Sequence, residues 1–475
     1  MKRNTLMALA AVFYAHSSSL GTTDQEKILA DDPGDGDKFG AQVAISGDTM
    51  AVAAPFYDTA TVTDAGAVFV YVRSGTTWSY QATLIASDPE SSDDFAGNEN
   101  DIGRTVAIDG DTIVVGAPNH TTPSPTINPG VVYVFVRSSN MWSEQQKIGG
   151  GNDGYQFGSS VDIEGDDLVI GERSATDNSV GTLVGAAYHY TRSSGTWSQN
   201  FQFTASTPDI GDFFGHTVAI SGDTVVVGAP GYDIGSDANT GAVYVFVDGG
   251  SGWSEEDILT ADDAAQSDDL ASSLDIDGDM VVAGAPGDNI TIDSVEHPNA
   301  GSAYVFTRSG ANWNDEDKLT ASDLEANDSL GESVSISGNT VVVGAPSEDN
   351  GGQSTGIGAM YVYTESSGDW SELAKYRAAD DADDENFAVS VAIDGNTIIA
   401  GALNDGTTPT MYGAAYVQYF VTCDEDFNGD CVVNGGDLGL LLANWGNPGA
   451  TDLNDDGTTD GSDLGLLLAA WGVCT

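Results

Sequence analysis

The sequence predicts an all-β fold, a seven-bladed β-propeller of four-stranded blades, followed by a small α-helical module at the C-terminus. Two observations predict the propeller: a phrase such as VAISGDTVVVGAP recurs seven times, and its copies start 55 to 63 residues apart. This spacing is typical of one four-stranded blade, and stacked blades bury a core that one blade cannot bury alone. The copies begin at Val43, Val106, Val161, Val218, Leu274, Val334 and Val391.

The strands within a unit are read from alternating apolar residues, most clearly in the fourth copy. Residues 218–221 and 224–229 flank a Gly-Asp pair, and both residue types tolerate the positive φ angles of a two-residue hairpin. The third strand is predicted at residues 241–247 and the fourth strand at residues 253–260. We therefore interpret the SGDT and DGDT sequences as turns.

The seventh unit lacks a fourth strand of its own, because its last apolar stretch is residues 413–420. The sequence DQEKILA at residues 24–30 matches the end of the fourth-strand pattern EEDILTA in the fourth copy. We predict that this N-terminal segment supplies the outer strand of blade seven. Such a strand closes the ring and holds both ends of the propeller.

Residues 1–21 are expected to be a secretory signal peptide. Met1, Lys2 and Arg3 precede the apolar stretch LMALAAVFYA, and small residues follow, so cleavage is expected between Ala15 and Gly21. No other stretch reaches the roughly 18 apolar residues that a membrane-spanning helix needs. The mature chain, with a propeller at residues 22–421 and a module at residues 422–475, is therefore expected to be secreted or attached to a cell surface, without membrane insertion.

Two short motifs recur at fixed places in these units. Phe-Gly pairs begin at Phe39, Phe157 and Phe214, and Gly-Ala-Pro sequences begin at Gly116, Gly228, Gly284 and Gly344. Residues 24–420 therefore resemble the FG-GAP repeat family, typified by the head of the integrin α-subunit. The resemblance implies a propeller that acts in extracellular recognition or adhesion. Calcium-binding integrin repeats carry a longer DxDxDG loop where this chain has short hairpins, so no calcium is expected in these turns.

The C-terminal module contains two acidic loops of twelve residues, DFNGDCVVNGGD and DLNDDGTTDGSD, each followed by an apolar helical stretch. Their spacing is that of calcium ligands, in which position seven offers a backbone carbonyl. The expected ligands are Asp426, Asn428, Asp430, Val432, Asn434 and Asp437 in the first loop, and Asp452, Asn454, Asp456, Thr458, Asp460 and Asp463 in the second. Gly457 suits the sharp bend of the second loop, whereas Cys431 stands there in the first.

Paired loop-helix units of this kind resemble a type I dockerin, an EF-hand-like domain. The resemblance implies that the module binds Ca²⁺ and docks onto a cohesin-type partner protein. Apolar residues after the loops are expected mainly in the core, with part of this surface open to a partner: Leu438, Leu441, Leu442, Leu464, Leu467 and Leu468. Cys423 can pair with Cys431 or with Cys474, and the sequence leaves both pairings open.

The chain carries 73 acidic and 14 basic side chains, for a net charge of −59. This charge excludes ordinary nucleic-acid binding and argues against binding to anionic membranes. Most of the carboxylates are interpreted as solvated surface groups and turn formers. Six tryptophans open the fourth strands and are interpreted as packing residues at the rim, with sugar platforms as the alternative: Trp78, Trp142, Trp197, Trp253, Trp313 and Trp370.

One face of the ring is expected to bind ligands. Strands alternate in direction, so the loops between strands two and three emerge on the same face as the crossings between blades, and variable loops on a rigid scaffold are typical binding sites. The longest such loops are residues 119–129, 231–240, 287–300 and 347–358.

The residue directly after each FG-type pair is expected at the mouth of the axis. These residues are Ala41, Arg104, Ser159, His216, Ser272, Glu332 and Val389. Arg104, His216 and Glu332 are the candidates for binding or acting on a polar substrate. Two residues before the FG-type hydrophobe stand Asp37, Asp212, Asp268, Asp328 and Glu385, with Asn100 and Tyr155 in the other blades. We interpret these acids as a repeated turn, with calcium binding as the alternative.

Two classes of function remain open. The favoured one is a non-catalytic recognition or adhesion protein, whose propeller binds a glycan or protein and whose C-terminal module binds calcium and docks to a cohesin-type partner. The alternative is a dockerin-bearing polysaccharide hydrolase or lyase that acts at the propeller axis. A hydrolase needs two carboxylates about 5 to 10 Å apart in one cleft, and the sequence pairs no two acids. No catalytic residue and no organic cofactor is assigned.

Overall fold

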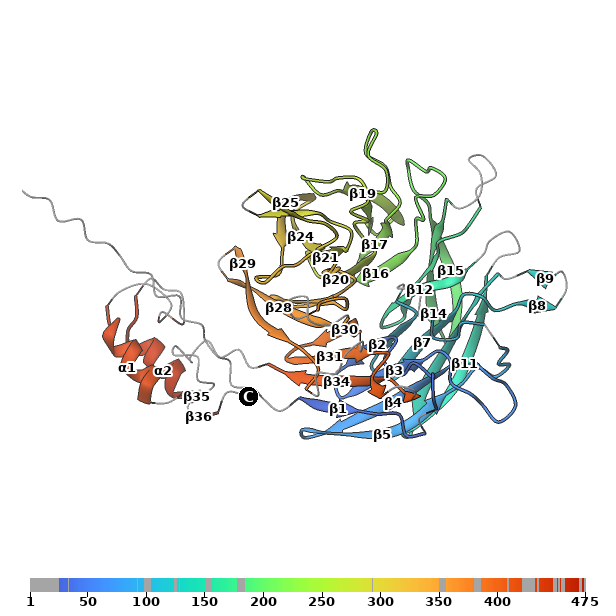
Figure 1. The fold of residues 1–475 in the computed structure, drawn as a ribbon, viewed down its shortest axis with the longest axis horizontal. Helices are drawn as coiled ribbons and strands as arrows, with labels where there is room; N and C mark the ends of the chain where they lie inside the picture. The colour runs from blue at the N-terminus through green and yellow to red at the C-terminus, as the bar shows by residue number, and fades with distance from the viewer. Residues whose placement is uncertain are drawn as a thin grey trace, which may run out of the picture. The chain divides into compact units, whose positions relative to one another are not determined.

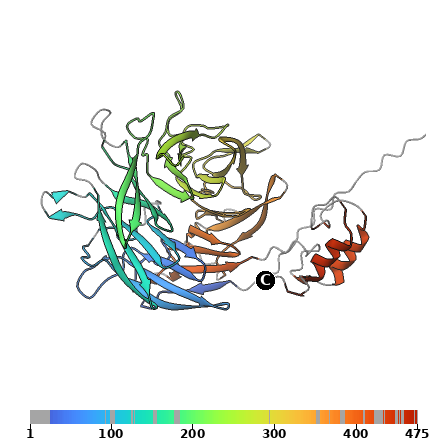
Figure 2. The same ribbon diagram turned by 180° about the vertical axis from the view of Figure 1, so that it is seen from behind.

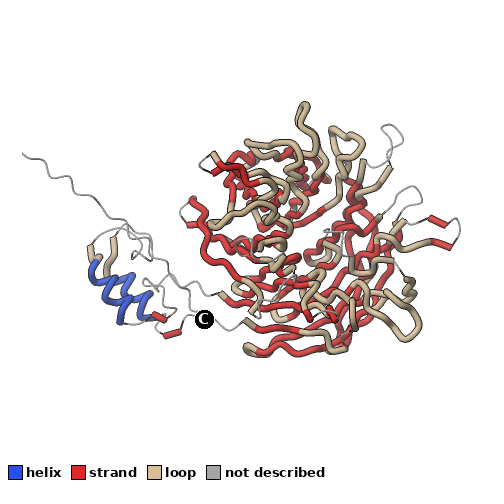
Figure 3. The backbone as a smooth tube through the Cα atoms, in the orientation of Figure 1, coloured by secondary structure: helices blue, strands red, loops and turns tan. Residues whose placement is uncertain are grey.

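The structure is a computed structural model (Figure 1). It describes residues 25–32, 34–91, 93–97, 104–123, 126–127, 129–150, 156–176, 184–292, 294–349, 356–366, 368–379, 386–407, 410–420, 432–433, 435–446, 451, 453, 458–469 and 472–473. The chain forms two compact units, one of residues 25–418 and one that includes residues 419–475. Strands make up the first unit, and both described helices belong to the second (Figure 3).

The first unit is a propeller of seven four-stranded antiparallel sheets, as the sequence predicts. Blades one to three are β2 (Val43–Ser46), β3 (Thr49–Ala54), β4 (Ala67–Ser74) and β5 (Thr77–Leu84); β6 (Val106–Asp109), β7 (Thr112–Ala117), β10 (Val131–Ser138) and β11 (Met141–Gly149); and β12 (Phe157–Glu164), β13 (Asp167–Glu172), β14 (Ala186–Ser193) and β15 (Thr196–Phe203). Blades four to six are β16 (Thr217–Ser221), β17 (Thr224–Ala229), β18 (Ala242–Asp248) and β19 (Trp253–Leu259); β20 (Ser273–Asp277), β21 (Met280–Ala285), β24 (Ser302–Ser309) and β25 (Asn312–Leu319); and β26 (Ser333–Ser337), β27 (Thr340–Ala345), β28 (Ala359–Ser366) and β29 (Asp369–Tyr376).

Blade seven is built from both ends of the propeller sequence. Its inner strands are β30 (Phe387–Asp394), β31 (Thr397–Ala402) and β34 (Ala414–Tyr419), and its outer strand is β1 (Glu26–Ile28). β1 pairs antiparallel with β34, with Glu26 opposite Val417 and Ile28 opposite Ala415. β1 thus has the place that the DQEKILA sequence predicts, and Figure 2 shows it beside the last blade.

The turns between the first and second strands connect neighbouring blades around the ring. In each blade the N–H of the turn glycine donates to the side chain that precedes the equivalent glycine in the blade before, at 2.5 to 3.1 Å. The seven pairs are Gly110 with Ser46, Gly165 with Asp109, Gly222 with Glu164, Gly278 with Ser221, Gly338 with Asp277, Gly395 with Ser337 and Gly47 with Asp394. A hydrogen-bonding side chain before the glycine therefore serves the contact between blades as well as the turn.

The FG and GAP motifs recur together because they meet where blades pack. The N–H of Gly215, the FG glycine of blade four, donates to the carbonyl of its GAP glycine, Gly228, at 3.0 Å. Between blades, a Cβ on Gly284 would lie 1.9 Å from the carbonyl oxygen of Gly331. Backbone on both sides leaves no room for a side chain, so the glycine permits the close approach of blades five and six.

The tryptophans of the fourth strands pack at the blade rim, as expected. The guanidinium of Arg137 lies 5.0 Å from the ring centre of Trp142, a cation–π contact. Its Nε donates to Asp111 in the turn at 2.6 Å, and its Nη1 donates to Thr49 of the preceding blade at 3.0 Å. Arg73, Arg192 and Arg308 repeat these contacts in blades one, three and five.

The second unit contains α1 (Gly435–Ala443), α2 (Gly461–Ala469) and the short pair β35 (Val432–Val433) and β36 (Gly472–Val473). Leu441 and Leu467 are fully buried, whereas Leu442 and Leu468 are each 52% exposed. Leu441 and Leu467 thus lie in the core, as expected for most of the six leucines, and Leu442 and Leu468 belong to the part of the apolar surface that was expected to stay open. No helix among the described residues is long and apolar enough to cross a membrane.

Candidate functional site

We call the face that carries the crossings and the loops between second and third strands the loop-rich face. Three of these loops form small hairpins: β8 (Thr122–Pro123) with β9 (Thr126–Ile127), β22 (Ile290–Ile292) with β23 (Val295–His297), and β32 (Gly406–Thr407) with β33 (Thr410–Met411). They belong to blades two, five and seven. The variable loops of the sequence thus build individual structures on a repeated scaffold.

The acids two residues before the FG-type hydrophobe form a repeated turn. Each carboxylate accepts the backbone N–H of the residue three places earlier, at 2.6 to 3.0 Å. The four pairs are Asp37 with Gly34, Asp212 with Asp209, Asp268 with Ala265 and Asp328 with Glu325. All four acids are buried. The turn interpretation is confirmed for them, while Glu385 and Tyr155 lie outside the described residues.

Blade two departs from the alignment that the sequence suggests. Ala96 N donates to the carbonyl of Gly116 at 2.9 Å, the bond that an FG glycine makes, so Phe95 occupies the FG position. Asp93 then holds the acidic position, where it accepts the N–H of Glu90 at 3.2 Å. The assignment of that position to Asn100, which lies outside the described residues, is wrong. Seven residues, 97–103, separate Phe95 and Ala96 from Arg104, so Arg104 does not directly follow the pair.

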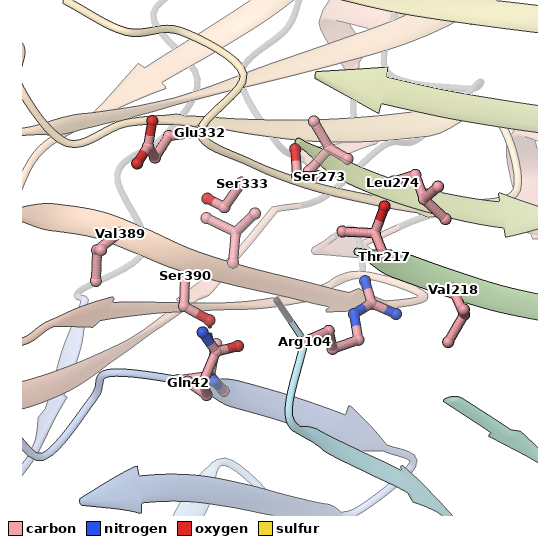
Figure 4. A pocket seen from close by; sticks show the side chains of 13 residues that line it. Gln42, Arg104, Thr217, Val218, Ser273, Leu274, Glu332, Ser333, Val389 and Ser390 are labelled. Atoms are coloured by element: carbon pink, nitrogen blue, oxygen red, sulfur yellow. Dashed lines mark hydrogen bonds between the residues drawn. The ribbon is translucent and has the colours of Figure 1, made fainter. Parts of the chain in front are cut away.

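Arg104 nevertheless reaches the axis, because its sequence separation from the start of the recurring phrase of its blade is the same as that of the equivalent residues in the other blades. It lines a pocket of about 30 Å³ together with Glu332 (Figure 4). Further polar side chains line it, beside apolar residues of the first strands: Gln42, Thr217, Ser273, Ser333 and Ser390. Burial, and second the charge of Asp269, raise the pKa of Glu332 to about 7. A volume this small suits water and not a sugar ring.

The guanidinium of Arg104 is held by Asp275 of blade five, with both nitrogen–oxygen distances at 3.2 Å. Asp275 also accepts the hydroxyl of Ser335 at 2.9 Å and the N–H of Ile336 at 3.1 Å. A second axial cavity, of about 140 Å³, is lined by Arg104, Asp275 and Asp162. Burial raises the pKa of Asp162 to about 7, although the charge of Arg104 acts against this rise. Arg104 therefore links blades two and five across the axis.

Sequence reasoning missed Asp162 and Asp275. Both stand second in the recurring phrase, where the other five blades carry Ala or Ser: Ala44, Ala107, Ala219, Ser335 and Ala392. An acid at an otherwise small, buried strand position is a signal that the sequence offered. The two acids carry charge into the axis at the level where Arg104 needs a partner.

His216 belongs to a different pocket, which we call the blade-four pocket. It has a volume of about 400 Å³ and is lined by Phe213, His216, Asn239 and Asp269 among others. Burial, and then the charge of Arg173, lower the pKa of His216 to about 4, so the imidazole is neutral at pH 7. A fourth pocket, of about 270 Å³, is lined by Glu332, Lys38 and Asn386.

The three axial candidates are therefore not gathered in one site. Arg104 and Glu332 share the small axial pocket, and His216 lines another. The described residues hold no group of three or more His, Cys, Asp or Glu side chains that could bind a metal ion. On the loop-rich face the arrangement suits ligand binding in pockets between blades. At the axis, the carboxylates of Asp162 and Asp275 line one cavity of about 140 Å³, where Asp275 is paired with the guanidinium of Arg104.

The C-terminal loops are described in part. Outside the described residues lie the expected ligands Asp426, Asn428, Asp430, Asn434, Asp452, Asn454 and Asp456, together with the three cysteines. Val432 begins β35, and Asp437 lies in α1. Asp463 is fully buried, and its two oxygens accept the N–H groups of Leu453 at 2.8 Å and Asp460 at 2.6 Å. These bonds hold the last carboxylate of the second loop against that loop.

Comparison with known families agrees with the repeat structure. The model of the FG-GAP repeat family matches seven stretches: residues 22–71, 78–135, 142–190, 197–246, 253–306, 313–363 and 370–418. Each stretch includes the first two strands and most of the third strand of one blade, and together the stretches cover more than half of the chain. No curated protein matches the chain. With seven matched repeats folded as seven blades, this chain belongs to the FG-GAP repeat family.

Proposed function

We propose that this protein is a non-catalytic recognition protein that acts outside the cell and binds a glycan or protein on the loop-rich face of its propeller. One observation carries the proposal: this face holds pockets of about 400 and 270 Å³ between blades, each lined by polar side chains. The larger pocket lies within the range of small-ligand sites, roughly 300–1,000 Å³, and the smaller one lies just below it. The guanidinium of Arg104 at the axis, in contrast, is already paired with Asp275. This pairing favours a structural role for Arg104 over a catalytic one.

Retention on immobilised polysaccharides tests this function. We expect the full chain to be retained on at least one member of a panel of neutral and acidic polysaccharides, without release of reducing or unsaturated ends. Release of such ends in proportion to protein would show an enzyme and contradict the proposal. If the chain is neither retained nor active on any member, the ligand is expected to be a protein, and retention on immobilised extracellular proteins is the next test.

We further propose that the C-terminal module binds Ca²⁺ and docks onto a cohesin-type protein. The donor types present fit this ion, because oxygen ligands from Asp, Asn and backbone carbonyls are those that Ca²⁺ takes. The buried carboxylate of Asp463, fixed by Leu453 and Asp460, supports the proposal for the second loop. The exposed Leu442, Leu468 and the 46%-exposed Trp445 supply an apolar surface for the partner.

Calcium is expected to slow amide hydrogen exchange in residues 426–471 of the full chain by at least about tenfold, because metal binding adds its free energy to local folding. Asp452→Ala and Asp456→Ala should remove this protection, and Ser462→Ala, an exposed residue outside the expected ligand set, should keep it. Hydrogen-exchange mass spectrometry with calcium and with a chelator measures the effect. Equal exchange rates under both conditions would contradict the calcium proposal without touching the propeller.

A further inference from the structure

The residue before each FG-type hydrophobe has a positive φ angle. The seven residues are Lys38, Asp94, Gln156, Phe213, Asp269, Ser329 and Asn386, with φ between 51° and 67°. A left-handed backbone costs roughly 1–2 kcal/mol for most side chains, and Asn and Asp tolerate it best. Six blades place a polar side chain there. Blade four places Phe213, which accepts this conformation without local hydrogen bonding in return.

Aromatic packing does not explain Phe213. The next residue, Phe214, is fully buried, and its ring lies 5.1 Å from that of Tyr244. Phe213 is only half-buried, and its ring contacts no other aromatic ring of the described residues. It lines the blade-four pocket instead. A strained residue that is left out of the core is a feature of functional sites.

Three polar side chains line the same pocket without a hydrogen-bond partner among the described residues: His216, Asn239 and Asp269. Their backbones, however, are fixed. His216 N donates to the carbonyl of Phe213 at 3.0 Å, and Asp269 N donates to the carbonyl of Asn239 at 3.1 Å. An imidazole, an amide and a carboxylate therefore line the pocket together with the aromatic ring, on a hydrogen-bonded backbone. This is a preorganised set of donors and acceptors for a ligand.

We propose that the blade-four pocket binds one neutral sugar residue of a glycan, a proposal that rests on the recognition function above. A pyranose ring has an apolar face of C–H bonds, which suits the ring of Phe213, and an edge of hydroxyls, which suits His216, Asn239 and Asp269. The volume of about 400 Å³ lies near the lower end of the range for small-molecule sites, roughly 300–1,000 Å³.

The charge of the chain favours a neutral sugar over an acidic one. A net charge of −59 repels anionic polymers at a distance. The pocket is lined by one carboxylate, that of Asp269, and one guanidinium, that of Arg173, so its charged side chains add no net positive charge that would attract an anion. A neutral glycan meets no such repulsion, and its hydroxyls can donate to the carboxylate of Asp269.

Titration calorimetry of the full chain with neutral hexasaccharides, namely cellohexaose, laminarihexaose, maltohexaose and mannohexaose, tests the proposal. We expect at least one to bind, and Phe213→Asn to weaken that binding by about tenfold or more. Asn stands at this position in blade seven as Asn386, so Phe213→Asn should leave the thermal midpoint unchanged or higher. A packing role for Phe213 predicts the opposite change in the midpoint.

Two further variants complete the test. His216→Ser introduces the residue found at this place in blades three and five, and it should also weaken binding of the sugar. If Phe213→Asn lowers the thermal midpoint, the binding measured with His216→Ser tests the pocket instead. Ser329→Asn, the matched change in blade six, should leave binding unchanged. Trigalacturonate, titrated in the same way, is the acidic control. Binding of trigalacturonate alone, or of none of the five sugars, overturns the inference. Binding that both pocket variants leave intact overturns it too, while retention on polysaccharides in the earlier experiment would still support the recognition function.

Discussion

A chain that begins at Asp31 is expected to unfold roughly 5–10 °C below a chain that begins at Gln25, because it lacks β1. Val417 and Ala415 of β34 lose their backbone partners. Ile28, which is 5% exposed, leaves an apolar gap in the outer part of blade seven. Unpaired backbone and exposed apolar surface both lower the free energy of unfolding.

The lost segment also contacts three blades. Lys27 Nζ lies 2.6 Å from a carboxylate oxygen of Asp405 in blade seven. The carbonyl of Leu29 accepts the hydroxyl of Tyr71 in blade one at 2.7 Å. The side chain of Gln25 accepts the N–H of Ala379, which follows blade six, at 2.7 Å. The segment therefore connects blade seven, where the two ends of the propeller sequence meet, with blades one and six. Its removal affects more than one sheet.

Differential scanning calorimetry of the two chains measures the difference, and light scattering supplies a second readout. Without β1, β34 becomes an exposed edge strand, so the shorter chain should associate as its concentration rises. The chain beginning at Gln25 is the matched control, since it keeps every contact named above. Equal midpoints for the two chains would show that β1 contributes little to ring closure.

The propeller is expected to be more stable near pH 5 than near pH 8, by roughly 5–10 °C in its thermal midpoint. Burial raises the pKa of Asp162, Glu172 and Glu332 to about 7, from the ordinary values of 3.8 for Asp and 4.5 for Glu. Burial likewise raises the pKa of the turn acids Asp212 and Asp328 to about 6.

The sign follows from proton binding. Between about pH 4 and pH 7 the folded chain holds protons on these carboxyls that the unfolded chain releases, so the stability present below pH 4 is lost as the pH rises through the folded values. Burial acts to raise the pKa of Asp88, but hydrogen bonds from Lys147 and Tyr133 together with the charges of Lys147 and His120 hold that pKa below its usual value, so the contribution of Asp88 falls only under more acidic conditions. His216, with its pKa lowered to about 4, acts in the opposite direction up to about pH 6.5, because the unfolded chain binds a proton there that the folded chain does not. The raised acids outnumber this one histidine, so they decide the slope between pH 5 and pH 8.

Salt and a single substitution separate the causes. About 1 M NaCl screens the repulsion between surface carboxylates but not the burial of Asp162, so part of the pH dependence should survive. Asp162→Asn should raise the midpoint near pH 8 and reduce the difference between the two pH values, whereas Asp369→Asn, at an exposed position, should leave that difference unchanged. A midpoint that rises from pH 5 to pH 8 would contradict this account of the axial and turn acids.

The propeller could be predicted from sequence because its signals are periodic. Each blade repeats a hairpin glycine, an FG-type hydrophobe and two buried strands, so an error in one copy is corrected by the other six. Blade two shows where this fails: the insertion at residues 97–103 moved the predicted FG position away from Phe95, although Asp93 already matched the acidic position. Local alignment by the acid would have found the right residue.

The site was less predictable because it depends on distances across the ring. The contact of Arg104 with Asp275 joins blades two and five, and no periodicity says which side chains face each other across the axis. Phe213 carried a signal only once the backbone conformation of its position was known. In the helices, the run LGLLLA has no polar side, so the sequence could not tell the buried Leu467 from the exposed Leu468.

The seven hydrogen bonds between turns bear on how such a ring can arise. Each blade offers one acceptor, the side chain before its glycine, and one donor, the glycine N–H, so every copy carries both halves of the same interface. Duplication of the gene segment for one blade therefore copies both the donor and the acceptor of the contact between blades. A propeller of this kind can gain a unit in evolution without inventing a new contact, and its blades are then free to diverge on the loop-rich face.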